Sequence, residues 1–185
     1  MRAAQDREAA WGRWREERDG LFRAHPQSPL TAAARSAFEG LDYFPYDPAL
    51  RVLAEVEEAE PEQLAIAASG GGGTIQFTRV GTALFELDGA GQTLALYWLD
   101  GYGGGAFLPF ADATRGTETY GAGRYLLDTV KGADLGEESG RLVLDFNFAY
   151  NPSCAYDPSW VCPLAPPPNR LAVPIRAGEL TFSAG

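Results

Sequence analysis

Hydrophobic and polar residues follow two different periods along this chain. The first is helical and covers residues 3 to 24. Trp11, Trp14 and Leu21 recur at intervals of three and seven residues, and arginine and glutamate fill the positions between them. This spacing places the large apolar side chains along one side of an α-helix. The pattern predicts an amphipathic N-terminal helix whose apolar side packs on the rest of the protein.

The boundaries of the helical part follow from its prolines, glycines and capping residues. His25 ends the first helix because the residue before a proline is driven out of helical geometry. Thr31 is suited to cap a short second helix, which Gly40 would end. Residues 40–50, GLDYFPYDPAL, combine prolines with aromatic residues and predict a loop that packs against the core.

From Leu50 onward the period changes to two, which is typical of strands with one buried face. Val52, Ala54 and Val56, for example, alternate with charged residues. The predicted strands lie at residues 52–56, 64–68, 74–80, 82–87, 93–99, 106–110, 124–130, 141–150, 171–175 and 180–182. A run of four glycines, a single glycine and the turn DGAGQ separate the early strands and predict antiparallel hairpins.

The predicted fold is mainly β, an antiparallel meander of about nine strands with an added N-terminal helix and a proline-rich loop. We expect a barrel rather than a sandwich, because an open meander leaves two unpaired edges and few residues here could protect them. Residues 1–47 would form a helical segment packed on the barrel, and residues 48–185 the β domain. The length of 185 residues fits one compact domain overall.

The composition of the chain limits the kinds of molecule that we expect it to bind. Hydrophobic residues make up 45% of the chain and charged residues 22%, as in ordinary globular proteins. The formal net charge is -10, and a surface with that charge repels phosphate backbones and anionic lipid. We therefore expect neither nucleic acid nor membrane as a partner. The oligomeric state is left open.

The cysteines and the single histidine limit the available chemistry. The N-terminal stretch has charges throughout and no apolar leader, which predicts a cytoplasmic protein with reduced thiols. Cys154 and Cys162 are separated by seven residues, unlike the ligands of a zinc knuckle, and His25 is the one histidine. We predict no metal site and no cofactor. Whether the two cysteines form a disulfide is left open.

The predicted strand at 141–150 carries two polar residues among large apolar ones. Asp145 and Asn147 lie on the face opposite Leu144 and Phe146. In one interpretation they hydrogen-bond the backbone of the proline-rich loop that follows, which has few N–H groups of its own. In the other, the loop holds them at the mouth of a pocket, since long ordered loops are often functional.

The second interpretation gives a polar ligand site in the region from Asp145 to Glu179. The residues predicted to bind a small molecule are Arg124, Asp145, Asn147, Tyr150 and Asn169. Asp145, Cys154 and Glu179 are the candidate catalytic residues if the protein is an enzyme, with Arg124 as a cation that could activate the thiol. Aromatic residues that pack the core or line a cavity are Tyr43, Phe44, Tyr46, Tyr97, Trp98, Tyr102, Phe107 and Phe110.

The runs DFNFAYNPSCAYDP and CPLAPPPNRLAVPIRAGE, with TYGAGRYL and LDYFPYDP, resemble a family of prokaryotic proteins known as domain of unknown function 1684. The resemblance covers nearly the whole chain, and Ala165 and Pro168 depart from it. The positions that match the family are Arg124, Asp145, Asn147, Tyr150, Asn151, Cys154, Cys162, Asn169, Arg170 and Glu179. The resemblance implies no reaction and no substrate, but it supports the region from Asp145 to Glu179 as the candidate site.

Three functions are compatible with these observations. We favour a small-molecule-binding β-barrel with an apolar interior and a polar rim. The second is an enzyme that uses carboxylate or thiol chemistry on a small substrate. The third is a structural or protein-interaction module, in which the proline-rich loop or the tryptophan-containing helix presents an apolar surface.

Overall fold

The computed structural model of the chain describes residues 6–100 and 104–183. Helix α1 (Arg7–Ala24) begins where the Asp6 carboxylate accepts a hydrogen bond from the amide of Ala9, and it ends before His25 as predicted. The predicted start at residues 3–5 lies outside the described residues. Helix α2 (Ala32–Ser36) is capped by the Thr31 hydroxyl, which confirms the short second helix, although it ends at Ser36 and not at Gly40.

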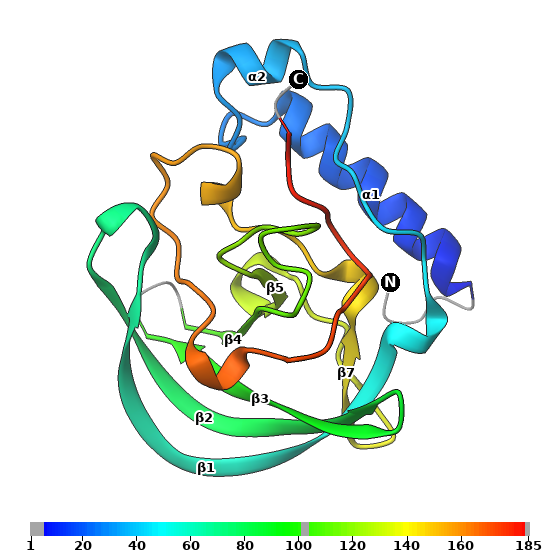
Figure 1. The fold of residues 1–185 in the computed structure, drawn as a ribbon, viewed down its shortest axis with the longest axis vertical. Helices are drawn as coiled ribbons and strands as arrows, with labels where there is room; N and C mark the ends of the chain where they lie inside the picture. The colour runs from blue at the N-terminus through cyan, green and yellow to red at the C-terminus, as the bar shows by residue number, and fades with distance from the viewer. Residues whose placement is uncertain (1–5, 101–103, 184–185) are drawn as a thin grey trace.

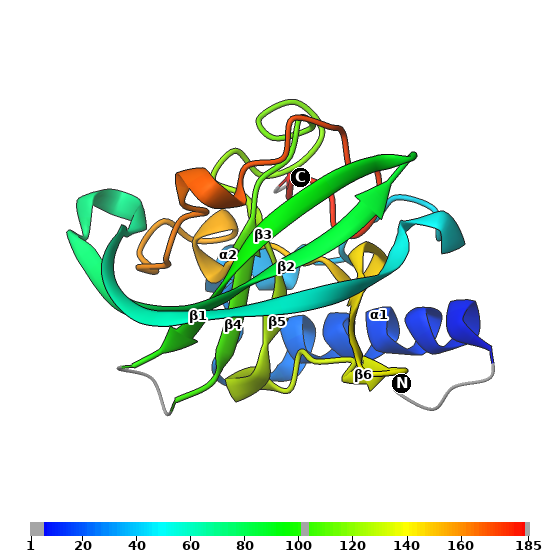
Figure 2. The same ribbon diagram turned by 90° about the horizontal axis from the view of Figure 1, so that it is seen from below.

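Seven strands of the described residues form one antiparallel sheet, so the mainly β prediction is confirmed (Figures 1 and 2). In chain order they are β1 (Arg51–Ala67), β2 (Thr74–Leu87), β3 (Ala90–Leu99), β4 (Ala106–Phe110), β5 (Arg124–Asp128), β6 (Glu137–Glu138) and β7 (Arg141–Asp145). Their spatial order is β5-β4-β3-β2-β1-β7-β6. Short 3-10 turns lie at Pro48–Leu50, Ser69–Gly71, Thr129–Lys131, Phe146–Phe148, Ser153–Ala155 and Pro167–Asn169.

The barrel prediction is wrong, because this sheet has two edges, β5 and β6. Strand β7 ends at Asp145, where the chain turns into the 3-10 helix Phe146–Phe148 and can no longer extend the ladder. The chain then touches the β5 edge at a single bridge, in which Tyr125 and Tyr150 exchange backbone hydrogen bonds of 2.8 and 3.0 Å. The sandwich alternative is not observed either, since the seven strands belong to one sheet.

The strand number of about nine is also wrong for the described residues, for two physical reasons. Gly81 does not separate two strands but lies inside β2, where a Cβ atom would come 2.7 Å from the carbonyl oxygen of Glu57 on β1. The absent side chain therefore permits close pairing rather than a turn. Likewise β1 continues past Pro61 through a register irregularity between Glu58 and Glu62, so two predicted strands become one long curved strand.

The C-terminal segment, residues 170–183, was predicted to contain two strands but runs as extended chain from the curved strands toward α1 (Figure 1). Leu171 and Ile175 join the largest buried cluster, which contains Phe85, Phe110 and Phe146. The concave side of the sheet is thus filled by the chain's own C-terminal segment. Helix α1 lies on the side of the molecule opposite β1 and β2 (Figure 1).

Asn169 is the residue that joins the C-terminal segment to the sheet. Strands β3 and β4 pair only around Tyr97 and Phe107, and beyond them the Asn169 side chain stands between the strands. Its amide exchanges hydrogen bonds of 3.0 and 2.9 Å with the backbone of Ala95 on β3 and donates one of 2.7 Å to the carbonyl of Pro109 on β4. A buried amide side chain therefore replaces the missing backbone ladder.

We expect Asn169→Ala to lower the free energy of unfolding by about 3 kcal/mol, because it leaves buried backbone groups of two strands without partners. Chemical denaturation followed by circular dichroism measures this. Gln63→Ala, which removes an exposed amide from β1, is the matched control and should change stability by less than about 0.5 kcal/mol. Equal stability of the two variants would contradict the proposed role of Asn169.

Candidate functional site

Arg124 on β5 is fully buried and is surrounded by partners from its own chain. Its guanidinium forms an ion pair of 3.2 Å with Asp112 and donates to the carbonyls of Ile175, at 3.0 Å, and Ala177. It also lies 5.1 Å from the ring centre of Phe110. Burial lowers the pKa of Arg124, and the Asp112 carboxylate offsets part of that change. These contacts fasten the C-terminal segment to the edge strand.

Glu179, in the same C-terminal segment, is also buried and joins three further parts of the chain. Its carboxylate accepts hydrogen bonds of 3.0 Å from Arg18 on α1 and from the amide of Asn151, and a third from the Tyr156 hydroxyl. A buried carboxylate with this many donors has its charge well compensated. Glu179 therefore ties α1 and the proline-rich loop to the C-terminal segment.

Asp145 and Asn147 are buried and bonded to each other. The Asp145 carboxylate accepts from the amide nitrogen of Asn147 at 3.1 Å and from its side-chain nitrogen at 2.8 Å. Asn147 in turn exchanges hydrogen bonds of 2.8 and 2.7 Å with the backbone of Asp47. Burial raises the pKa of Asp145, although the bonds from Asn147 act in the opposite direction. The interpretation that this pair bonds the proline-rich loop is wrong, because its partner is the loop before β1.

Tyr150 lines a pocket of about 510 Å³ beside α1, which we call the Tyr150 pocket. The Arg18 guanidinium lies 4.8 Å from its ring centre, and Trp14 forms part of the same wall. The Tyr150 hydroxyl is 3.4 Å from the carboxylate of Asp128, which also pairs with Lys131 at 3.3 Å. Burial raises the pKa of Tyr150 well above its ordinary value, so its hydroxyl keeps its proton.

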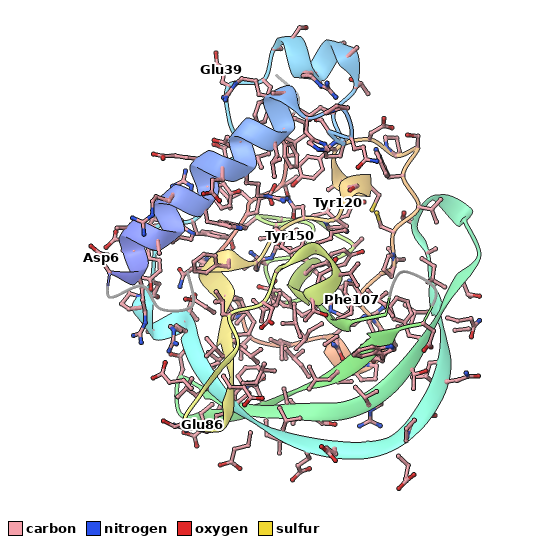
Figure 3. The ribbon with its side chains drawn as sticks, turned by 180° about the vertical axis from the view of Figure 1, so that it is seen from behind. Asp6, Glu39, Glu86, Phe107, Tyr120 and Tyr150 are labelled. Carbon is pink, nitrogen blue, oxygen red and sulfur yellow. The ribbon has the colours of Figure 1, made fainter. Side chains whose placement is uncertain are left out.

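A second pocket of about 510 Å³, the Cys162 pocket, opens at the ends of the central strands. Four strands, β2 to β5, form its apolar wall with Ile75, Phe77, Leu99, Phe107 and Tyr125. The proline-rich loop adds Ser153, Trp160, Val161, Cys162 and Pro163. Asp128 and Lys131 give it a charged side, and Lys131 also lines the Tyr150 pocket. Phe107 lies toward the middle of the molecule, as do Tyr120 and Tyr150 (Figure 3).

Cys154 and Cys162 are free, buried thiols in contact with each other. The Cys162 sulfur lies 3.3 Å from the amide nitrogen of Cys154, and the Tyr120 hydroxyl lies 3.6 Å from the Cys154 sulfur. Hydrogen bonding from Cys162, assisted by Ser69 and Tyr120, lowers the pKa of Cys154 to about 6, although burial acts in the opposite direction. The same contact raises the pKa of Cys162. Neutral donors, rather than Arg124, thus stabilise the thiolate.

The predicted site residues are therefore not gathered around one cavity. Tyr150 lines a pocket, whereas Arg124, Asp145, Asn147 and Asn169 are occupied by protein partners. Their roles as ligand contacts, and the catalytic roles of Asp145, Cys154 and Glu179, stay predictions. The sequence did not predict the Cys162 pocket, although Phe107 was among the aromatic residues named as possible cavity residues. Tyr102, which was also named, lies outside the described residues.

Two further features concern metals and membranes. Within residues 6–100 and 104–183, no three histidine, cysteine or acidic side chains come close enough together to hold a metal ion. None of the helices in the same part of the chain has the length and apolar character needed to cross a membrane.

Comparison with protein-family models shows to which family this chain belongs. Residues 36–180 match the family model described as protein of unknown function (DUF1684). The chain belongs to the DUF1684 family. This confirms the resemblance seen in the sequence. The chain is also similar, with 35% identity and a TM-score of 0.67, to the solution NMR structure of an uncharacterized protein from Haloarcula marismortui, and the match covers 96% of this chain and 95% of that one. No curated protein matches.

The two pockets differ in how much of their lining belongs to the segment matched by the DUF1684 model. This segment begins at residue 36, after α1, so Trp14 and Arg18 of the Tyr150 pocket lie outside it. Apart from Gln27, the residues that line the Cys162 pocket lie inside it. The Cys162 pocket is thus built almost entirely from the part of the chain that defines the family.

The raised pKa of Asp145 predicts the effect of Asp145→Asn on stability. Because burial disfavours the carboxylate, wild-type stability should increase as pH falls from 7 to about 4 and the group becomes protonated. The asparagine oxygen can still accept both bonds from Asn147 but carries no charge. We expect the variant to be at least as stable as wild type at pH 7, with an advantage that shrinks toward pH 4, measured by denaturant unfolding.

Asp157→Asn is the control, because its effect on stability at pH 7 should have the opposite sign. Hydrogen bonds from Ser159 lower the pKa of Asp157, so its carboxylate contributes stability above the unfolded pKa and loses it as pH falls. This variant should lose a little stability at pH 7. A clear loss of stability at pH 7 in Asp145→Asn would show that the charge of Asp145 is favourable, and it would contradict burial as the main influence on this carboxyl group.

Proposed function

We propose that this DUF1684 protein binds a small molecule in the Cys162 pocket, within the region from Asp145 to Glu179 and the strands beside it. The observation that carries the proposal is a pocket of about 510 Å³ whose wall is made by apolar and aromatic side chains from four neighbouring strands. Ligand sites in proteins are typically hollows of this size, with apolar walls and a few polar groups. The ligand class that fits has an apolar or aromatic body.

The polar groups of the pocket lie on one side and suggest where the ligand's polar end binds. Asp128 is buried and shared by Tyr150 and Lys131, so its charge is already compensated. The Lys131 side chain is half exposed, and Ser153 beside the pocket offers a hydroxyl. We infer that a hydroxyl, carboxylate or similar acceptor group on the ligand contacts Lys131 and Ser153.

In this proposal most of the predicted polar residues position the pocket and do not fill it. Tyr150 acts through Asp128, to which it donates a hydrogen bond. Arg124 and Asn169 hold the C-terminal segment under β3 to β5, which carry part of the apolar wall. Direct ligand contact by Arg124, Asp145, Asn147 or Asn169 stays a prediction.

Val161→Trp tests the proposal, because a larger side chain at this position on the pocket wall reduces the free volume. Anilinonaphthalene sulfonate, a dye with an aromatic body and an anionic group, is the probe. We expect the wild type to bind it with quenching of Trp160, and the variant to bind it at least about tenfold more weakly. Fluorescence titration gives both dissociation constants, and Trp160→Phe identifies the reporting tryptophan.

Val56→Trp is the matched control. Val56 and Val161 are valines of similar exposure, 46% and 55%, but Val56 lies on β1 away from the pocket. Val56→Trp should leave dye binding unchanged. Dye binding that is unaffected by Val161→Trp, or equally weakened by both substitutions, would contradict ligand binding in the Cys162 pocket.

A further inference from the structure

The two thiols beside the Cys162 pocket have different environments. The Tyr120 hydroxyl lies 3.6 Å from the Cys154 sulfur, and the neighbouring Cys162 and Ser69 side chains also lower the pKa of Cys154. Cys162 lines the pocket and is the partner whose pKa is raised, so it keeps its proton. A stabilised thiolate next to a protonated thiol is the arrangement needed for one sulfur to be oxidised and the other to complete a disulfide.

Both thiols are attached to well-anchored backbone. The amide of Cys162 donates to the Ser69 hydroxyl at 2.9 Å, and the amide of Ser69 donates to the Cys162 carbonyl at 2.9 Å, which fixes Cys162 to the turn after β1. Cys154 lies in the 3-10 turn Ser153–Ala155. The contact of 3.3 Å between the Cys154 amide and the Cys162 sulfur holds the two residues together.

We propose that Cys154 and Cys162 form a peroxide-sensitive dithiol that closes reversibly to a disulfide. Hydroperoxides are the class of oxidant, because they are small enough to reach a buried thiolate and react with it directly. Cys154 is the attacking sulfur and Cys162 the resolving one. Cellular dithiol reductants would reopen the bond.

The chemistry balances in two steps. The Cys154 thiolate attacks one peroxide oxygen, the O–O bond breaks, and the departing hydroxide takes up the proton that the thiol had lost, which leaves Cys154 as a sulfenic acid and releases water. The Cys162 sulfur then attacks the Cys154 sulfur, the S–O bond breaks, and the hydroxide leaves as water with the Cys162 proton. In total two thiols are oxidised to one disulfide, and one hydrogen peroxide is reduced to two waters; an alkyl hydroperoxide would give one water and one alcohol.

Disulfide formation would also change the pocket, a consequence that rests on the proposed function. Residues 155–161 would become a closed loop between the two sulfurs, and this loop carries Trp160 and Val161 of the pocket wall. Closing a loop restricts the conformations of the chain within it. We therefore expect oxidation to change the affinity for the anilinonaphthalene dye, whereas the oxidation itself does not depend on a ligand.

The first experiment treats the full chain with hydrogen peroxide and follows intact mass and thiol content. The reduced wild type should lose the mass of two hydrogen atoms together with both alkylatable thiols, and dithiothreitol should reverse this. Cys162→Ser should stop at a sulfenic acid on Cys154 that dimedone traps. Cys154→Ser should leave a thiol that reacts no faster than a cysteine peptide. Near-UV circular dichroism checks that both variants are folded.

A second measurement separates a reactive thiol from a merely structural one. In Cys162→Ser, the rate of Cys154 oxidation should reach half its maximum at a lower pH than in a cysteine peptide, since the Tyr120 hydroxyl still approaches the sulfur. Adding Tyr120→Phe removes one donor and should move this midpoint to higher pH. Tyr43→Phe is the control, because the buried Tyr43 hydroxyl has no hydrogen-bond partner among the described residues.

Three results would overturn the proposal: wild-type protein that forms no disulfide with peroxide, cysteines that oxidise independently to sulfinic or sulfonic acids, or a midpoint that is the same with and without the Tyr120 hydroxyl. Failure of the proposed function is distinguishable from these. If the reduced protein does not bind the dye but forms the disulfide, only ligand binding is contradicted. If the reduced protein binds the dye but its thiols react like those of a cysteine peptide, only the peroxide-sensitive dithiol is contradicted.

Discussion

A guanidinium is buried at Arg124, where it pairs with Asp112 and donates to the backbone of the C-terminal segment. A charge in this position is costly unless its donors find acceptors, and here carbonyls of Ile175 and Ala177 supply them. The C-terminal segment therefore has to lie along the concave side of the sheet. It fills the space that a closed barrel would enclose, which is why an open, curved sheet can still have a packed core.

The same segment carries the second charge of the network, at Glu179. This carboxylate receives donors from α1, from the proline-rich loop at Asn151, and from Tyr156. Segments that are far apart in the sequence are thus held by two buried charges of opposite sign. With the loop fixed in this way, Trp160 and Val161 lie beside apolar residues of β2 to β5, and the Cys162 pocket has a defined shape. The network therefore positions the segments that line the pocket in which we propose that a ligand binds.

Local structure could be predicted from the sequence where it depends on neighbouring residues, as in the period of α1 and the cap at Thr31. Gly81 was misinterpreted as a break, and the strands predicted at 52–56 and 64–68 are one strand, since a bulge and a turn use the same residues and differ only in what packs across the strand. The candidate site was predicted only in part for a similar reason. Polar residues in an apolar strand correctly indicated buried hydrogen bonds, but the partner of Asn147 is Asp47, 100 residues away. Period-two patterns place side chains on a face, and they do not show which of them border a cavity.

One buried network holds α1, the proline-rich loop and the C-terminal segment together, and hydrogen–deuterium exchange of Glu179→Gln tests this most directly. The variant keeps the shape of the side chain and removes its charge. We predict faster amide exchange in all three regions, at residues 11–24, 150–157 and 175–181, with β2 and β3 unchanged. Faster exchange confined to the residues next to position 179 would contradict a shared network.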